Sequence, residues 1–99
     1  MDALRERLVQ LAGEGATITY EELRRELRLE GDLVPLLRAL SVAEDDAGRG
    51  LLTAVVVRAD TQLPGDGWFR LAQERGRNGR DRRATWNDER SRLQKLHDR

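Results

Sequence analysis

Leucines recur at helical spacing through the first part of the chain. Leu4, Leu8 and Leu11 lie three or four residues apart, so they fall on one face of a helix. Gly13 follows the pattern at the position where a helix C-terminus is commonly capped. The spacing therefore predicts a first helix over residues 2–12.

Two more helices are predicted after a short β-rich stretch. Thr19 and Glu22 have the spacing of a capping box, in which each side chain accepts a hydrogen bond from a free backbone amide, and Gly31 marks the end of this second helix. Asp32 is a suitable N-cap for a third helix. The third helix is the clearest core element, with an apolar stripe formed by Leu33, Leu36, Leu37 and Leu40.

The middle of the chain carries the strongest strand pattern. Residues 51–57 form an apolar, β-branched run, and residues 61–67 form a loop rich in turn residues. Residues 68–75 are consistent with a helix or with a second strand, and we favour the helix. These elements predict an α+β, mostly helical fold: a winged-helix-like domain with a short two- or three-stranded sheet.

The C-terminal part changes in composition. Residues 76–83 are rich in arginine and glycine, which is typical of a linker. An amphipathic helix is predicted from about residue 84 to residue 98, with an apolar face made of Trp86, Leu93 and Leu96. This face is too sparse to stabilise an isolated helix, so it must pack on its own domain, on a second copy or on a partner. The predicted organisation is a domain at 1–75, a linker at 76–83 and a helix at 84–99.

Charge is distributed unevenly although the net charge is zero. Residues 1–69 contain 8 arginines and 13 acidic residues, whereas residues 70–99 contain 10 basic and 5 acidic residues, giving −5 and +5. A basic tail of this kind either seeks an anionic partner or folds back onto the acidic part of its own chain.

Composition also limits the setting of the protein. The chain has 99 residues and no cysteine, which excludes disulfides and thiolate chemistry and favours a cytoplasmic location. No stretch reaches the roughly 20 apolar residues that a membrane span requires. The N-terminal residues are charged and lack the apolar segment of a signal peptide, so we expect no membrane partner.

The order of the predicted elements resembles that of winged-helix domains, and residues 17–23 are similar to the strand-to-helix entry common in them. Residues 51–57 and 63–69, followed by a tryptophan-containing helix, resemble a pattern found in small bacterial winged-helix-like proteins of unassigned function. A looser similarity links the chain to the winged-helix half of alkyltransferase-like proteins. The Pro-Cys-His-Arg-type active-site motif of those proteins is absent here, so no catalytic residue is carried over.

Nucleic-acid binding by the third helix is disfavoured by its charge. Asp45 and Asp46 and their acidic neighbours outnumber the single cation Arg38, so a DNA backbone would repel this surface. The basic candidates for contact with phosphates or with a partner lie elsewhere, at Arg70, Arg75, Arg77, Arg80, Arg82 and Arg83. Equally, these arginines are suited to pair with the acids of the third helix.

No residue set predicts catalysis, a cofactor or a metal. The only histidine, His97, has no nucleophile in a triad-like pattern, and residues 65–67 lack the lysine and the glycine spacing of a nucleotide-binding loop. The leading hypothesis is a non-enzymatic protein-interaction module, adaptor or regulatory, that binds a protein partner or forms a homodimer. The alternative is a DNA- or RNA-binding regulator that contacts phosphates through the arginine-rich region, and a small-molecule sensor is a third, weaker hypothesis.

Overall fold

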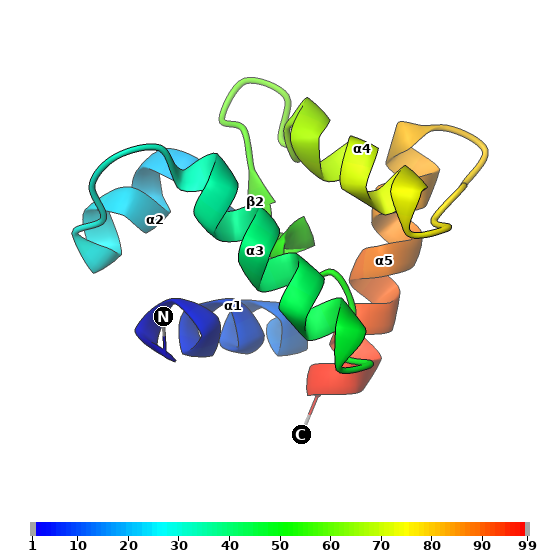
Figure 1. The fold of residues 1–99 in the computed structure, drawn as a ribbon, viewed down its shortest axis with the longest axis horizontal. Coiled ribbons are helices and arrows are strands. Elements are labelled where there is room, and N and C mark those ends of the chain that lie inside the picture. The colour runs from blue at the N-terminus through cyan, green and yellow to red at the C-terminus, as the bar shows by residue number, and fades with distance from the viewer. Residues whose placement is uncertain (1, 99) are drawn as a thin grey trace.

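The computed structural model describes residues 2–98, and Figure 1 shows helices arranged around a very small sheet. In chain order the elements are α1 (Asp2–Glu14), β1 (Ile18–Thr19), α2 (Tyr20–Leu27), α3 (Leu33–Asp46), the 3₁₀ helix η1 (Leu52–Val55), β2 (Val56–Val57), α4 (Asp66–Glu74) and α5 (Arg82–His97). The prediction of a mostly helical α+β chain with a short sheet is therefore confirmed.

The predicted starts of α2 and α3 are confirmed by their caps. The side chain of Thr19 accepts a hydrogen bond from the amide of Glu22 at 3.1 Å, and the Glu22 carboxylate accepts one from the amide of Thr19 at 3.1 Å. Asp32 accepts a hydrogen bond from the amide of Val34 at 3.0 Å. These side chains satisfy backbone donors that have no partner within the helix.

Helix α2 ends earlier than the glycine at position 31 predicts. Its last residue is Leu27, and Arg28 adopts a left-handed conformation with φ of 54°. The amide of Leu29 then donates to the carbonyl of Arg24 at 2.9 Å, which closes the helix end. An arginine thus takes the backbone conformation that glycine adopts most readily.

The strand prediction for residues 51–57 is wrong over most of its length. Residues 52–55 form η1, and only Val56 and Val57 pair with another strand. The pairing is parallel and joins Val56 to Ile18 of β1. Because every residue of the run is buried, its apolar character reflects burial on all sides and does not distinguish a strand from a tight helix.

The segment after β2 leads into a helix. Residues 58–65 form a loop whose end is the N-cap of α4. The predicted helix over 68–75 is confirmed and begins two residues earlier, at Asp66. The alternative of a second strand there is wrong, and within residues 2–98 the sheet has two strands.

Helix α5 packs against the C-terminal end of α1 and shares its core. A Cβ atom at Gly13 would lie 2.7 Å from the carbonyl oxygen of His97, so the close approach of the two backbones requires glycine. Arg90 of α5 donates a hydrogen bond to the carbonyl of Gly15 at 2.8 Å. Of the packing modes left open by the sequence, the structure shows α5 on its own chain.

The predicted linker over 76–83 is held to its neighbours at several points. The amide of Arg77 donates to the carbonyl of Ala72 at 2.8 Å, and the amide of Gly79 donates to Thr85 at 2.8 Å. Asp81 caps α5, so this helix begins two residues before the predicted position 84. The segment between α4 and α5 is therefore anchored by hydrogen bonds to both helices.

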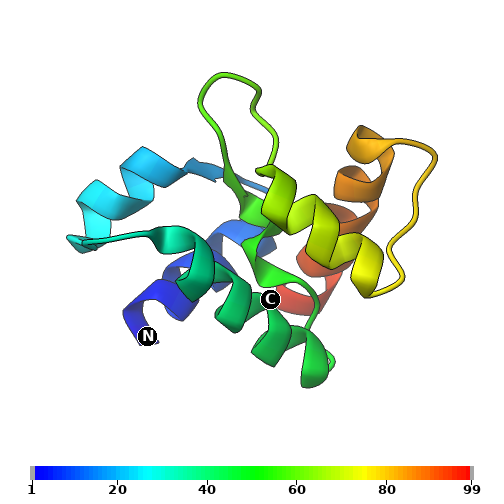
Figure 2. The same ribbon diagram turned by 45° about the horizontal axis from the view of Figure 1, so that its top comes forward.

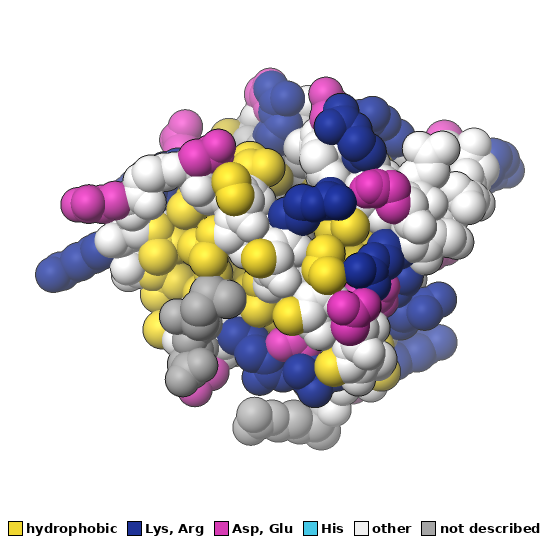
Figure 3. Space-filling model, viewed as in Figure 1, with side chains coloured by type: hydrophobic (Ala, Val, Ile, Leu, Met, Phe, Trp, Pro, Cys, Tyr) yellow, Lys and Arg dark blue, Asp and Glu magenta, His cyan; other side chains and the backbone are white. Residues whose placement is uncertain are grey.

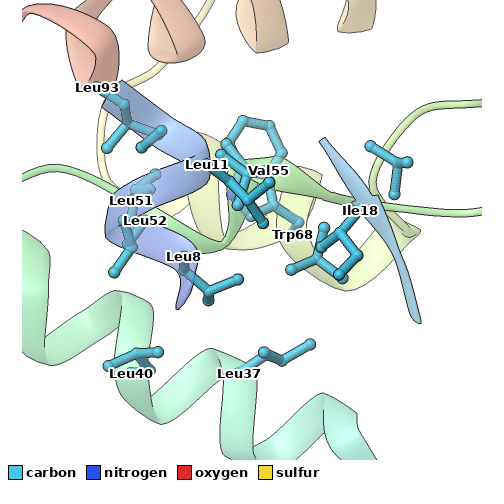
Figure 4. Close-up of a cluster of buried hydrophobic side chains, with 14 of the residues drawn as sticks. Leu8, Leu11, Ile18, Leu37, Leu40, Leu51, Leu52, Val55, Trp68 and Leu93 are labelled. Carbon is cyan, nitrogen blue, oxygen red and sulfur yellow. The ribbon is translucent and has the colours of Figure 1, made fainter. Parts of the chain in front are cut away.

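The core lies where α1, α3 and α5 meet the buried segment that contains η1. Figure 4 shows leucines of α1 and α3 directed toward Leu51 and Leu52, with Trp68 of α4 nearby. The indole nitrogen of Trp86 donates to the carbonyl of Ala54 at 2.8 Å, which ties α5 to η1. This core holds α3 and α4 on either side of the η1–β2 segment, as both ribbon views show (Figures 1 and 2).

The helices of the fold are short or rich in charged residues. Within residues 2–98 none of them is both long enough and apolar enough to cross a membrane.

Candidate functional site

Two of the six predicted contact arginines form ion pairs with acids at the C-terminal end of α3. Arg77 forms ion pairs with Asp45 at 2.6 Å and with Glu89 at 3.1 Å. Arg75 pairs with Asp46 at 2.6 Å. The Glu89 side chain is 1% exposed and that of Asp45 is 12% exposed. This part of the basic tail therefore folds back onto the acidic end of α3.

Arg75 and Arg77 form a cluster of ion pairs with Asp45, Asp46 and Glu89, and these pairs shift pKa values within the cluster. Burial alone would raise the pKa of Asp45, but the hydrogen bonds and charges of Arg77 and Arg75 outweigh burial and hold that pKa below its usual value. Burial likewise opposes the charge of Arg77, and hydrogen bonds to Asp45 and Glu89 raise the pKa of Arg77 above its usual value. The cluster is thus a set of matched internal charges.

The other four predicted arginines are more exposed and are not brought together as one cationic surface. Arg82 pairs with Asp66 at 2.6 Å and lies over the ring of Phe69, 4.7 Å from its centroid. Among the described residues, no ion pair is formed by Arg70, Arg80 or Arg83. Arg70 lies on α4, whereas Arg80 and Arg83 lie near the start of α5.

The predicted apolar docking face of the last helix is mostly covered. Trp86 is 5% exposed and Leu93 is fully buried, both within the chain's own core. Leu96 is 48% exposed and is the part of this face that the fold leaves at the surface. A partner would have to displace α5 from α1 to reach the two buried side chains.

A groove between α3 and α4 has a volume of about 650 Å³. Its apolar lining is Leu33, Val34, Leu37, Trp68 and Leu71. Val34 is 55% exposed although it is apolar. In Figure 3, hydrophobic side chains are visible between α3 and α4, with charged side chains beside them.

Local structure sets the shape of this groove. Gly65, the N-cap of α4, donates its amide hydrogen to the hydroxyl of Tyr20 at 3.2 Å, which fixes the start of α4 next to the start of α2. A Cβ atom at Gly67 would lie 3.9 Å from Cγ1 of Val34. The first turns of α3 and α4 therefore face each other, and glycine at position 67 keeps the space between them open.

The rim of the groove carries charges of both signs, but its acids are already engaged. Glu74 pairs with Arg38 at 3.0 Å, Asp66 pairs with Arg82, and Asp32 caps α3. The hydrogen bond and charge of Arg82 hold the pKa of Asp66 below its usual value. The carboxylates of the rim therefore have partners within the chain.

Some donors in the lining lack such partners. Arg70 forms no ion pair within the described chain, and Arg24 donates only to the backbone carbonyl of Gly31. The indole nitrogen of Trp68 is buried and has no hydrogen-bond acceptor among the described residues. Buried donors without acceptors are uncommon in folded proteins.

Sequence reasoning missed this groove because its walls come from separate helices. One signal was available: Val34 is an apolar residue that stands outside the predicted stripe of the third helix. Gly67 was interpreted as part of a turn, whereas it lies inside α4. Within the described residues, no group of histidine, cysteine or acidic side chains is arranged to hold a metal ion.

Comparisons with protein-family models, with curated proteins and with solved structures give no match, so no family is assigned to the chain.

Proposed function

We propose that this chain is a non-enzymatic protein-interaction module, adaptor or regulatory, that binds a short segment of a partner protein in the groove between α3 and α4. The observation that carries the proposal is the apolar lining of the groove, in which Val34 stays 55% exposed while the rest of the hydrophobic chain is largely buried. Concave apolar surfaces with a few placed polar groups are the usual form of binding sites.

The scaffold in this proposal is winged-helix-like and cytoplasmic. It has the order helix, short strand, two helices and second strand, with the loop over 58–65 in the place of a wing. The absence of cysteine fits a reducing compartment. The groove lies at the N-terminal half of α3, away from the acidic C-terminal end.

The alternative, a DNA- or RNA-binding regulator, has weaker support. Phosphate contacts need arginines whose charge is not already matched. Arg75, Arg77 and Arg82 are each paired with acids of the same chain. The unpaired cations Arg80 and Arg83 favour this alternative, and binding of a random DNA duplex at low salt would support it.

Selection from a random 12-residue peptide library displayed on phage tests the proposal. The folded chain is the target, and the Val34→Asp variant is the counter-target. Val34 is the second residue of α3, where a carboxylate is favoured by the helix dipole, so this variant should fold normally. Circular dichroism and urea unfolding check that it does.

We expect peptides with apolar anchors that bind the wild-type chain and lose at least roughly tenfold in affinity on Val34→Asp, which places a charge at the apolar contact. Ala39→Asp is the matched control, because Ala39 is exposed on the same helix and does not line the groove. A selection that yields only peptides insensitive to Val34→Asp would contradict the proposal. Self-association seen by light scattering and removed by Val34→Asp would identify a second copy as the occupant.

A further inference from the structure

We infer that the partner segment held in the α3–α4 groove is acidic, with carboxylates placed on either side of an apolar anchor. This inference rests on the proposed function and names the chemistry of its ligand. It follows from an inventory of hydrogen-bond donors and acceptors in the lining of the groove.

The acceptors of the groove are satisfied from within the chain. The Asp66 carboxylate accepts from Arg82 at 2.6 Å, and the Glu74 carboxylate accepts from Arg38 at 3.0 Å. The Asp32 carboxylate accepts from the first turn of α3 at 3.0 Å. A ligand that brought mainly cations would compete with these contacts.

The donors of the groove are in excess. Arg70 forms no ion pair in the described chain, although its charge acts on the Asp66 carboxylate, and Arg24 has only a backbone carbonyl as its hydrogen-bond partner. These two guanidinium groups in one lining are complementary to the oxygen atoms of acidic side chains.

The backbone adds to this preference for anions. The first residues of both α3 and α4 line the groove, so two helix N-termini point toward one cavity. The N-cap of α4 is Gly65, which has no side chain to satisfy the first amides of that helix. The start of α4 therefore presents amides without a capping side chain beside Asp66 of its first turn, whereas the start of α3 is capped by the Asp32 carboxylate.

A peptide fits this lining better than a nucleic acid does. The apolar side chains of Val34, Leu37 and Leu71 would lie against a charged phosphate backbone without compensation. A peptide can place two carboxylates at the free donors and an apolar side chain between them.

The test uses synthetic versions of one peptide from the library selection. Three peptides keep the same apolar anchors and carry Glu, Gln or Lys at the remaining polar positions, each with a fluorescent label. Anisotropy titrations measure the dissociation constant for the full chain. We expect the Glu peptide to bind roughly tenfold tighter than the Gln peptide, as two exposed ion pairs provide, and the Lys peptide to bind most weakly.

Matched double variants assign the preference to residues. Arg24→Gln with Arg70→Gln should bring the Glu peptide to the affinity of the Gln peptide. Arg80→Gln with Arg83→Gln removes the same charge outside the groove and should leave the preference unchanged. High salt should weaken binding of the Glu peptide and not of the Gln peptide.

The outcomes separate this inference from the proposed function. Equal affinities for the three peptides, all still lost on Val34→Asp, would overturn the acidic ligand and leave the groove as a binding site. Displacement of the Glu peptide by a 12-base-pair DNA duplex, lost on the Arg24 and Arg70 double variant, would overturn it in favour of a nucleic acid. Failure to select any peptide sensitive to Val34→Asp is the separate failure of the proposed function.

Discussion

The two ends of α3 differ in the burial and ion pairing of their side chains. At the C-terminal end, Glu44 is 2% exposed and is held by Arg5 and Arg49, and Asp45 is held by Arg77. At the N-terminal end, Val34 is 55% exposed and the nearby Arg70 has no ion pair within the described chain. One end is closed by internal charge pairs, and the other leaves an apolar side chain exposed.

This difference shows what the charge asymmetry of the sequence means. Residues 70–99 carry a net charge of +5, but three of their arginines form ion pairs with acids of the same chain. They are Arg75, Arg77 and Arg82. The charge that is available to a partner is therefore local and cannot be counted along the chain. It lies where an arginine, such as Arg70, lines the groove without an ion pair among the described residues.

The largest expected effect is at the closed end, in the helix that completes the core. Leu93→Ala should lower the free energy of unfolding by about 3 kcal/mol, because it leaves a cavity where a fully buried side chain of the core packs beside Gly50. Urea unfolding followed by circular dichroism measures the change.

Leu96→Ala is the control on the same helix. Because Leu96 is 48% exposed, this variant should lose less than about 1 kcal/mol. Equal small effects of both substitutions would mean that α5 does not contribute to the core and would remove the contrast between the two ends of the molecule.

A second large effect is expected from breaking the ion pairs at the same end. Arg77→Gln leaves Asp45 and the buried Glu89 without their shared cation, and should cost about 3 kcal/mol of unfolding free energy. Arg83→Gln is the control, since Arg83 is exposed and has no ion pair in the described chain, and it should change stability by less than about 0.5 kcal/mol. Similar values for the two variants would show that the cluster does not hold the fold together.

The sequence predicted the parts of the fold that depend on local chemistry. The capping box of Thr19 and Glu22 and the N-cap Asp32 place two helices, because each cap is a contact between residues a few positions apart. The run over 51–57 was misjudged because its conformation depends on what surrounds it. A buried apolar run has no polar face to reveal a period.

The groove could not be predicted for a related reason. It exists because the contact of Tyr20 with Gly65 brings the starts of α2 and α4 together across 45 positions of sequence. The pairing of Arg77 with Asp45 was one of two interpretations open to sequence reasoning, and only the fold shows which acids lie within reach. Long-range contacts of this kind decide which charges remain for a partner.

A smaller effect is expected from acid, and it also acts at the closed end. Burial opposes the charge of Glu44, but hydrogen bonds from Arg49 and Arg5 outweigh it, so the pKa of Glu44 is lowered, as is the pKa of Asp45. A lowered pKa in the folded state stabilises the protein above the ordinary carboxyl pKa of about 4, and this contribution is lost as pH falls through the lower folded value.

Unfolding free energies measured between pH 6 and pH 2 should therefore fall as the medium becomes more acidic. The decrease should be smaller for Arg77→Gln, in which Asp45 has lost the main cause of its lowered pKa. A decrease of the same size in both proteins would mean that the carboxylates of this cluster are not the groups that respond to acid.

The smallest effect on stability is expected at the open end, where Gly67 keeps the groove clear. Gly67 lies inside α4 with an ordinary helical backbone, and an added Cβ would make only normal contact with Val34, at 3.9 Å. Gly67→Ala should therefore raise the unfolding free energy by about 0.5 kcal/mol, because alanine loses less conformational freedom in a helix. The same methyl group stands between α3 and α4, so this variant should bind groove-dependent peptides more weakly although it is more stable.

Gly76→Ala is the control for this prediction. Nothing lies within 4 Å of its added Cβ, but its φ of +81° strains any side chain, so this variant should lose about 1 kcal/mol of unfolding free energy and keep its peptide affinity. If Gly67→Ala left peptide affinity unchanged, the space between the first turns of α3 and α4 would not be where the ligand binds.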